Sequence, residues 1–191
     1  MLDGDAPAYQ AFYCEENVWH LGRRLAPVVG YAGVLVISGF GKRVALCAQR
    51  AGRPGDGLLA WDYHVVLITG SSRLSADTLV WDFDHVPGFP AVLADWKQES
   101  FPPWFGVPVE FLPGFRLVDY EEYAALLSSD RSHMKDGDAW LQPPPTWPEI
   151  QRPGVENNVL RFADLSDSIG GEIVTLQDLI CRSAESEPDA P

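Results

Sequence analysis

Cysteine is scarce in this chain: its 191 residues include three, Cys14, Cys47 and Cys181. None of them forms a C-x-x-C pair and their number is odd, so the sequence predicts neither a disulfide framework nor a cysteine-rich zinc site. Each cysteine is then either a small buried hydrophobic residue or a nucleophile.

Long apolar runs and positive charge are also lacking. No segment approaches the roughly 20 apolar residues that cross a bilayer, and the acidic start Met1–Pro7 does not resemble a secretory signal. The 14 Lys and Arg face 27 Asp and Glu, which gives a net charge of −13. This balance argues against nucleic acid and anionic membranes as partners, whereas a cationic peptide amino terminus is compatible with it. We expect a soluble protein of the cytoplasm, with the nucleus as a second compartment.

Several familiar catalytic and metal-binding motifs are missing as well. The chain has no HExxH, no GxSxG and no EF-hand loop, and Gly39-Phe40-Gly41-Lys42 lacks the first glycine of a phosphate loop. No paired ligands accompany the cysteines or histidines. The sequence therefore predicts no metal and no cofactor.

What is present favours one globular domain spanning 1–191, with flexible tails at about 1–10 and 184–191. Hydrophobic residues make up 46% of the chain, enough for one core. Helical spacing predicts helices over 14–25, 91–99, 119–127 and 175–181, and β-branched or aromatic runs predict strands over 31–37, 43–49, 58–69, 78–83 and 115–118. Short crossovers and a hairpin between 58–69 and 78–83 favour the α+β class, with helices flanking a mostly antiparallel sheet.

Two further local signals concern helix starts and a long loop. Asp119 with Glu122, and Thr175 with Asp178, have the spacing of capping boxes. Residues 128–158 have little periodicity, and so long a loop is uncommon in a compact domain unless it has a function. We interpret it as a candidate wall of a substrate site.

Cys14 stands where the first helix is expected to begin. Free backbone N–H groups and the positive end of the helix dipole would lower the thiol pKa there and could stabilise an oxyanion. A buried structural cysteine is the alternative reading of Cys14. Cys47, in an apolar strand, and Cys181, in an amphipathic helix, fit that alternative better.

His64 lies inside an apolar strand, where an imidazole is costly unless its nitrogens are hydrogen-bonded. Asp82 interrupts the apolar run of the strand expected to pair with it, and a buried acid beside an imidazole fixes the tautomer of a catalytic base. Asp84 competes for the same role, and a hydrogen-bonded core histidine is the alternative for His64. His20 and His85 are expected at the surface, while a histidine at position 133 lies on the irregular loop and could line a pocket.

Several segments in the same order resemble a known family. They are Tyr13-Cys14-Glu15-Glu16-Asn17, Arg53-Pro54-Gly55-Asp56-Gly57, Trp61-Asp62-Tyr63-His64-Val65-Val66-Leu67, Asp82-Phe83-Asp84 with Phe89-Pro90, Ser129-Asp130-Arg131-Ser132-His133-Met134-Lys135 and Pro143-Pro144-Pro145. Over roughly residues 9 to 180 the chain resembles the protein N-terminal glutamine amidohydrolase (WDYHV-motif) family. The resemblance implies a papain- and transglutaminase-like fold and a Cys-His-Asp triad that falls on Cys14, His64 and Asp82.

The resemblance also implies a reaction. The thiolate would attack the side-chain carboxamide of an N-terminal glutamine, release ammonia and leave glutamate after hydrolysis of a γ-glutamyl thioester, which would feed the N-degron pathway. The substrates are then proteins or peptides with a free N-terminal Gln, and we expect a monomer. The candidate substrate-binding residues are Glu15, Glu16, Asp62, Tyr63, Asp84, Ser132 and His133, with the three acids Glu15, Glu16 and Asp62 considered for the ammonium group.

Other readings of the same residues stay open. The order Cys, His, Asp also suits a cysteine protease or a transglutaminase-type acyl transferase. A module that binds N-terminal residues without turnover is the alternative from outside enzymology.

Overall fold

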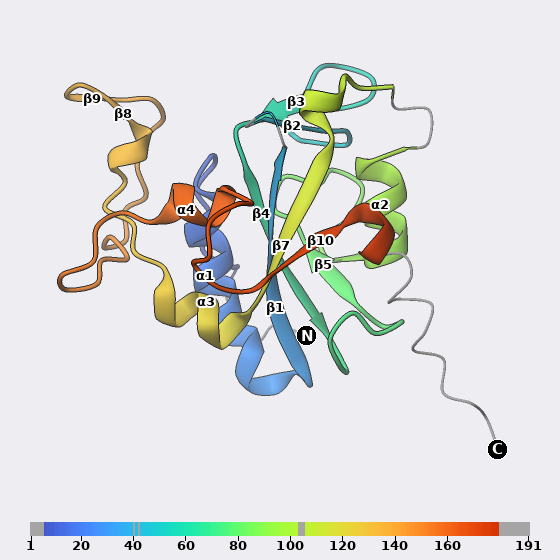
Figure 1. Cartoon of the computed structure of the whole chain (residues 1–191), viewed down its shortest axis with the longest axis horizontal. Coiled ribbons are helices and arrows are strands. Elements are labelled where there is room, and N and C mark those ends of the chain that lie inside the picture. The colour runs from blue at the N-terminus through green and yellow to red at the C-terminus, as the bar shows by residue number, and fades with distance from the viewer. Residues whose placement is uncertain (1–5, 40, 42, 103–105, 180–191) are drawn as a thin grey trace.

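The central element is a six-stranded sheet in the order β10-β7-β1-β4-β5-β6, with every neighbouring pair antiparallel (Figure 1). The computed structural model describes residues 6–39, 41, 43–102 and 106–179. The strands of this sheet are β1 Tyr31–Gly39, β4 His64–Gly70, β5 Leu79–Trp81, β6 Ala91–Val92, β7 Pro113–Asp119 and β10 Glu172–Thr175.

Smaller elements surround the sheet. The helices are α1 Cys14–Leu25, α2 Leu93–Ser100, α3 Tyr120–Leu126 and α4 Val159–Ala163, and single 3₁₀ turns cover Ala26–Val28, Val109–Phe111 and Ser132–Met134. Two-stranded sheets join β2 Val44–Leu46 to β3 Leu59–Trp61, and β8 Lys135–Asp136 to β9 Ala139–Trp140. The β8-β9 hairpin projects from the body of the molecule (Figure 1).

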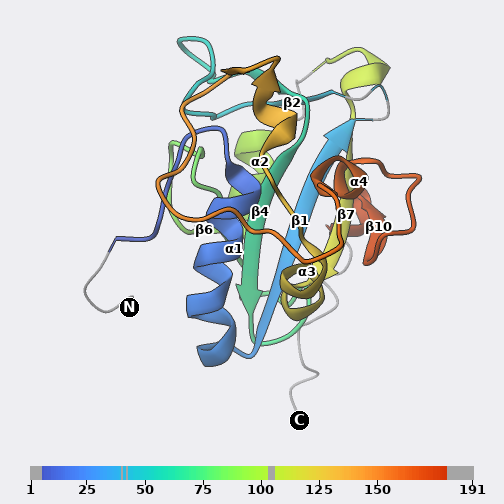
Figure 2. The ribbon, with the colours of Figure 1, turned by 90° about the vertical axis from the view of Figure 1, so that its left-hand side faces the viewer.

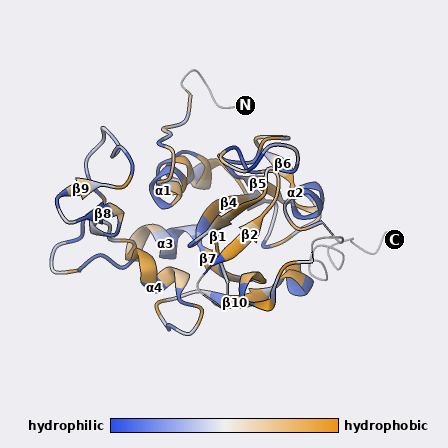
Figure 3. Ribbon diagram, turned by 90° about the horizontal axis from the view of Figure 1, so that it is seen from above, coloured by the Kyte–Doolittle hydropathy of each residue, from blue (hydrophilic) through white to orange (hydrophobic). Residues whose placement is uncertain are grey.

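Both faces of the sheet are covered, which explains why its strands read as continuous apolar runs. Along β1, Val34 and Val36 belong to the hydrophobic cluster that includes α1, α3 and α4, whereas Leu35 and Ile37 belong to the cluster that includes α2. The central strands are coloured mainly as hydrophobic in Figure 3. The expected α+β class with a mostly antiparallel sheet is confirmed, and nothing conflicts with a papain- and transglutaminase-like fold.

Helix α1 has the predicted bounds and lies along β4 (Figure 2). Val18, Leu21 and Leu25 recur at helical spacing and are buried, while Arg23 and Arg24 follow in the last turn, where the dipole favours cations.

The two predicted capping boxes differ in outcome. Asp119 makes no side-chain cap to α3 within the described part of the chain and instead accepts a hydrogen bond from the Tyr31 hydroxyl at 2.8 Å. Thr175 and Asp178 do form the reciprocal pair, at 2.7 Å from the Thr175 N–H to Asp178 Oδ2 and 3.2 Å from the Asp178 N–H to Thr175 Oγ1.

Three expectations about segments need correction. The run 58–69 is two strands, because β3 pairs with β2 whereas β4 pairs with β1 and β5. Residues 6–10 are not a frayed tail, since Tyr9 stacks on Phe83 at 5.5 Å and Gln10 exchanges two 2.8 Å hydrogen bonds with Asn17. The loop 128–158 contains the 3₁₀ turn and the β8-β9 hairpin.

Two expectations fall at the carboxyl end of the chain. The tail predicted at 184–191 and Cys181 lie outside the described residues.

Among the residues that are described, no helix is both long and apolar enough to cross a membrane.

Candidate functional site

His64 and Asp82 form a buried hydrogen-bonded pair. His64 begins β4, Asp82 directly follows β5, and the antiparallel register of the two strands brings them together. Nε2 of His64 lies 2.8 Å from Oδ1 of Asp82, and the residues are 0% and 1% exposed. Burial lowers the pKa of His64, but the charge of Asp82, its hydrogen bond and the charge of Asp84 together outweigh burial, so the pKa is raised overall. Burial alone would raise the pKa of Asp82, yet His64 and the other donors bring it down to about 2.

Two residues that sequence reasoning missed hold the second oxygen of Asp82. Oδ2 accepts hydrogen bonds from Trp96 Nε1 at 3.0 Å and from Gln49 Nε2 at 3.4 Å. Gln49 Oε1 in turn accepts from Trp61 Nε1 at 3.1 Å, and the Trp61 ring stacks on His64 at 5.0 Å and 17°. These donors keep the carboxylate ionised and fix its orientation.

The Arg53–Gly57 segment explains how Gln49 is held in place. The backbone N–H of Gln49 donates to the carbonyl of Gly57 at 3.0 Å. Gly57 has φ +64°, and a Cβ there would lie 2.7 Å from the Gln49 nitrogen, so only glycine fits. The turn chemistry was recognisable in the sequence, but its contact with Gln49 was not.

Cys14 occupies the first position of α1 and is 5% exposed. Its thiol donates to Oε2 of Glu15 at 3.8 Å, and the backbone N–H of Val65 hydrogen-bonds the sulfur. Val65 follows His64 in β4, so the sulfur lies against the backbone at the start of this strand. Nδ1 of His64 nevertheless has no hydrogen-bond partner among the described residues, so Cys14 and His64 are not hydrogen-bonded to each other.

The expected lowering of the Cys14 pKa is wrong. Burial raises this pKa well above its ordinary value, and the charges of Glu15, Asp84 and Asp82 raise it further, against a smaller lowering by the Val65 hydrogen bond. Desolvation disfavours the thiolate more than the helix terminus favours it.

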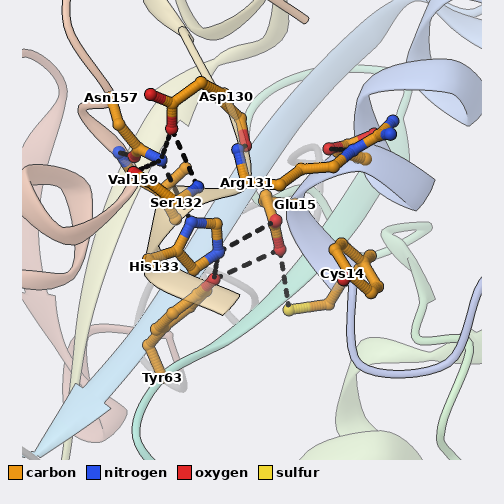
Figure 4. A network of polar contacts seen from close by, with 12 residues as sticks. Cys14, Glu15, Tyr63, Asp130, Arg131, Ser132, His133, Asn157 and Val159 are labelled. Carbon is orange, nitrogen blue, oxygen red and sulfur yellow. Dashed lines mark hydrogen bonds and ion pairs between the residues drawn. The ribbon is translucent and has the colours of Figure 1, made fainter. Parts of the chain in front are cut away.

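Glu15 is 1% exposed and is the centre of a polar network (Figure 4). Its Oε2 accepts from the Tyr63 hydroxyl at 3.2 Å, and its Oε1 lies 3.4 Å from Nε2 of His133. The Tyr63 hydroxyl is also 3.1 Å from that Nε2, while Nδ1 of His133 is 3.1 Å from Nδ2 of Asn157. Asn157, which sequence reasoning missed, also bonds Ser132 Oγ at 3.3 Å.

Glu16 makes a separate set of contacts, and both of its carboxylate oxygens are engaged. Its two oxygens accept from Nε and Nη2 of Arg131 at 2.8 Å each, and Oε2 also accepts from Trp147 Nε1 at 2.7 Å. Arg131 holds φ +59° and also bonds the carbonyl of Trp147 at 2.9 Å. This cluster, the Glu16–Arg131 clamp, ties the loop 128–158 to the first turn of α1.

Asp62 and Tyr63 line a pocket of about 590 Å³ together with α4 and the residues after it. The Asp62 side chain is 75% exposed and pairs with Arg43 at 3.1 Å. Tyr63 borders both this pocket and the Glu15 carboxylate.

Asp84 is the second carboxylate beside His64. It is 3% exposed, accepts from the Tyr9 hydroxyl at 3.3 Å, and its pKa is raised by burial. Ligand atoms of His64, Asp82 and Asp84 lie within 4.8 Å of one another, compact enough for a cation. Because Asp82 already uses His64 Nε2, we assign the three groups to a hydrogen-bonded charge cluster.

Two other histidines were expected at the surface. His85 is instead 2% exposed, with Nδ1 3.1 Å from the carbonyl of Gly88 and Nε2 3.0 Å from Glu99. His20 is half-buried and packs edge-on against Trp19 and Trp147. Cys47 is buried, at 3% exposure, as expected.

Comparison with known proteins gives a consistent result. Residues 9–183 match the family described as N-terminal glutamine amidase. Similar proteins include the human protein N-terminal glutamine amidohydrolase, 33% identical over 93% of this chain and 88% of that protein, and the protein of the same name from Arabidopsis thaliana, 34% identical over 90% and 84%. The protein of that name from Caenorhabditis briggsae is 35% identical over 86% and 88%. The chain therefore belongs to the N-terminal glutamine amidase family.

Proposed function

We propose that this protein deamidates the side chain of an N-terminal glutamine on proteins or peptides to glutamate, with Cys14 as nucleophile, His64 as base and Asp82 as its orienting acid. The observation that carries the proposal is the buried His64–Asp82 pair. Asp82 holds Nε2 at 2.8 Å, and Nδ1 is left without a partner among the described residues, while the Cys14 sulfur accepts a hydrogen bond from the backbone N–H of the next residue, Val65. An imidazole oriented at one nitrogen and free at the other is what an activated thiol needs.

In this mechanism His64 Nδ1 takes the proton of Cys14, and the sulfur attacks the γ-carboxamide carbon. Backbone N–H groups of the first turn of α1 stabilise the oxyanion. The tetrahedral intermediate collapses as His64 returns its proton to the departing ammonia. A water molecule, deprotonated by His64, then hydrolyses the γ-glutamyl thioester, giving glutamate and the free thiol.

We further propose that Glu15 binds the substrate's ammonium group. Of the three acids considered, Glu16 has both oxygens engaged by Arg131, and Asp62 is 75% exposed to solvent. Glu15 is buried, adjacent to Cys14, and its Oε1 accepts no hydrogen bond within the described part of the chain. A buried, incompletely satisfied carboxylate favours a free amino terminus and rejects an acetylated one. Tyr63, Asp84, Ser132 and His133 remain proposed contributors to substrate binding.

The test is incubation of the full chain with a peptide that begins with glutamine. We expect ammonia release and conversion of the first residue to glutamate, without backbone cleavage or amine incorporation, which would instead indicate a protease or a transglutaminase. Cys14→Ser should lower the rate by about 10³-fold or more, whereas Cys47→Ser should not. Undiminished turnover by folded Cys14→Ser would contradict the proposal.

Metal independence, oligomeric state, location and pathway are further points that rest on this proposal. EDTA should leave the rate unchanged, since thiolate chemistry needs no metal. A monomeric state, a cytoplasmic and nuclear location, and a role in the N-degron pathway are proposed on the same basis.

A further inference from the structure

The Glu15 carboxylate sits in an unfavourable place for a nucleophilic thiol. Its Oε2 is 3.8 Å from the Cys14 sulfur, in surroundings where Glu15 is 1% and Cys14 5% exposed. Water screens little there, so ionised Glu15 and a thiolate repel each other strongly. The contact suits a protonated thiol that donates to the carboxylate.

The side chains joined to Glu15 by dashed lines in Figure 4 are those of Cys14, Tyr63 and His133, and none of the three carries a permanent positive charge. Asn157 Oδ1 accepts from the Val159 N–H at 3.1 Å, and its Nδ2 donates to Asp130 at 2.8 Å, which fixes the orientation of the amide. Nδ2 therefore also donates to His133 Nδ1 at 3.1 Å, and that nitrogen must be unprotonated. The His133 ring therefore donates from Nε2 rather than from Nδ1.

The direction of the remaining hydrogen bonds follows. His133 Nε2 donates to the Tyr63 oxygen at 3.1 Å, and the Tyr63 hydroxyl donates its own proton to Glu15 Oε2 at 3.2 Å. Glu15 is thereby held as an acceptor, and its Oε1 accepts no hydrogen bond from residues 6–39, 41, 43–102 or 106–179.

Among the described residues, the other groups that act on the sulfur include no cation. Asp82 and Asp84 carry negative charge, and burial keeps Tyr63 and Tyr123 neutral by raising the pKa of each well above its ordinary value. The positive charge of Arg131 is engaged by Glu16. His64 presents an Nδ1 without a hydrogen bond to Cys14. In agreement with this charge balance, the pKa of Cys14 is raised.

We infer that the substrate's own ammonium group switches the nucleophile on: by pairing with Glu15 it displaces the Cys14 thiol, which turns to His64 Nδ1 and transfers its proton there. The inference rests on the proposed function and deepens it. The S–H bond breaks and an N–H bond forms at Nδ1. The resulting imidazolium is paired with ionised Asp82. The thiolate is no longer repelled by Glu15, because the ammonium group of the substrate offsets the charge of that carboxylate. Free amino termini are then selected in kcat as well as in KM, because an acetylated glutamine leaves the thiol protonated.

Substituting Glu15 should produce two opposite effects. In Glu15→Gln, iodoacetamide should alkylate Cys14 at least about tenfold faster than in the wild type at pH 7, as followed by peptide mapping. A tenfold increase corresponds to a fall of one unit in the thiol pKa. Deamidation of a glutamine-initiated peptide should fall by about 10²-fold, because the ammonium loses its partner. Glu15→Asp should keep alkylation slow if charge is the cause, and the exposed Glu121→Gln should change neither rate.

A second measurement needs no substitution at Glu15. A peptide that begins with norleucine offers a free ammonium and a side chain of similar length without a carboxamide. Its binding should raise the ultraviolet thiolate absorbance of the wild-type protein, whereas its N-acetylated twin should not, and Cys14→Ala should give no signal with either.

The inference is overturned if folded Glu15→Gln is alkylated no faster than the wild type, or if saturating norleucine peptide leaves the thiolate absorbance unchanged. Either result leaves deamidation by Cys14 intact. Full activity of Cys14→Ser, in contrast, would remove the proposed function itself.

Discussion

Asp82 accepts four hydrogen bonds, from His64, Gln49, Trp96 and the backbone N–H of Asp84. Its folded pKa is about 2, so its ionised form stabilises the fold above the unfolded value near 4, and this contribution is lost as the pH falls toward 2. The pKa of His64 is raised, so its contribution is complete below its ordinary value of 6.5 and is lost as the pH rises through the folded value.

We therefore predict that Asp82→Asn lowers the free energy of unfolding by about 2 kcal/mol between about pH 4 and 6.5, with a smaller loss on either side. Its kcat should fall by about 10²-fold, since the base loses its orienting anion. Denaturant unfolding across pH, beside deamidation kinetics, measures both effects. The exposed Asp95→Asn serves as control, and a stability loss independent of pH would contradict the assignment.

At this scale the sequence identifies residue types better than their environments. An imidazole in an apolar run and an acid in the neighbouring strand were enough to select His64 and Asp82 as candidates, because such groups are costly without partners. Burial of Cys14 and the proximity of Asp84 and Asp82 depend on tertiary packing, and so the pKa of Cys14 was predicted in the wrong direction. His85 was misplaced for the same reason, since its partner Glu99 lies on α2.

At the scale of elements, periodicity located α1 and the central strands but not the break at Asp62 and Tyr63. An apolar run does not reveal that β3 and β4 join different sheets, which depends on partners far away in the sequence. The predicted cap at Asp119 fails because a distant hydroxyl, that of Tyr31, takes the carboxylate.

Arg116 is the clearest case of an element held by one side chain. It lies on β7, is 2% exposed, and donates to the carbonyls of Phe162, Asp164, Asp167 and Gly170 at 2.6–3.0 Å. The carbonyl of Phe162 lies near the end of α4, and the other three carbonyls follow this helix. Because α4 and the residues after it line the pocket beside Tyr63, Arg116 fixes that wall of the pocket.

We predict that Arg116→Met lowers the free energy of unfolding by about 3 kcal/mol or more, because buried carbonyls lose their donor. That corresponds to a fall in Tm of about 6–12 °C for a chain of this size. Arg43→Met, which removes an exposed ion pair, should cost less than about 1 kcal/mol. Equal Tm values for the two variants in differential scanning calorimetry would contradict this role for Arg116.

At the scale of the whole molecule, the loop 128–158 brings its residues to the first turn of α1. Sequence reasoning could select this loop as a functional segment because a long irregular loop in a compact domain is unusual. It could not find the Glu16–Arg131 clamp, since an acid in a first helical turn reads equally well as a partner of the helix dipole. The clamp matters for the site because Arg131 lies near His133 in the sequence, and Glu16 directly follows Glu15. The side chains of His133 and Glu15 approach each other to 3.4 Å.

We predict that Arg131→Met costs about 3–5 kcal/mol of stability, because Glu16 is left as an unpaired buried charge. Amide hydrogen exchange in 128–158 should accelerate, and KM for a glutamine-initiated peptide should rise, as His133 and Tyr63 lose their fixed positions around Glu15. Arg131→Met combined with Glu16→Gln should restore part of the stability, since no buried charge remains, but not the slow exchange of the loop. The exposed pair Arg161 and Asp167 provides the matched control through Arg161→Met. Unchanged exchange in 128–158 would mean that contacts other than the clamp, such as the Tyr13 hydroxyl on the Gln142 carbonyl at 3.2 Å, are sufficient to hold the loop on α1.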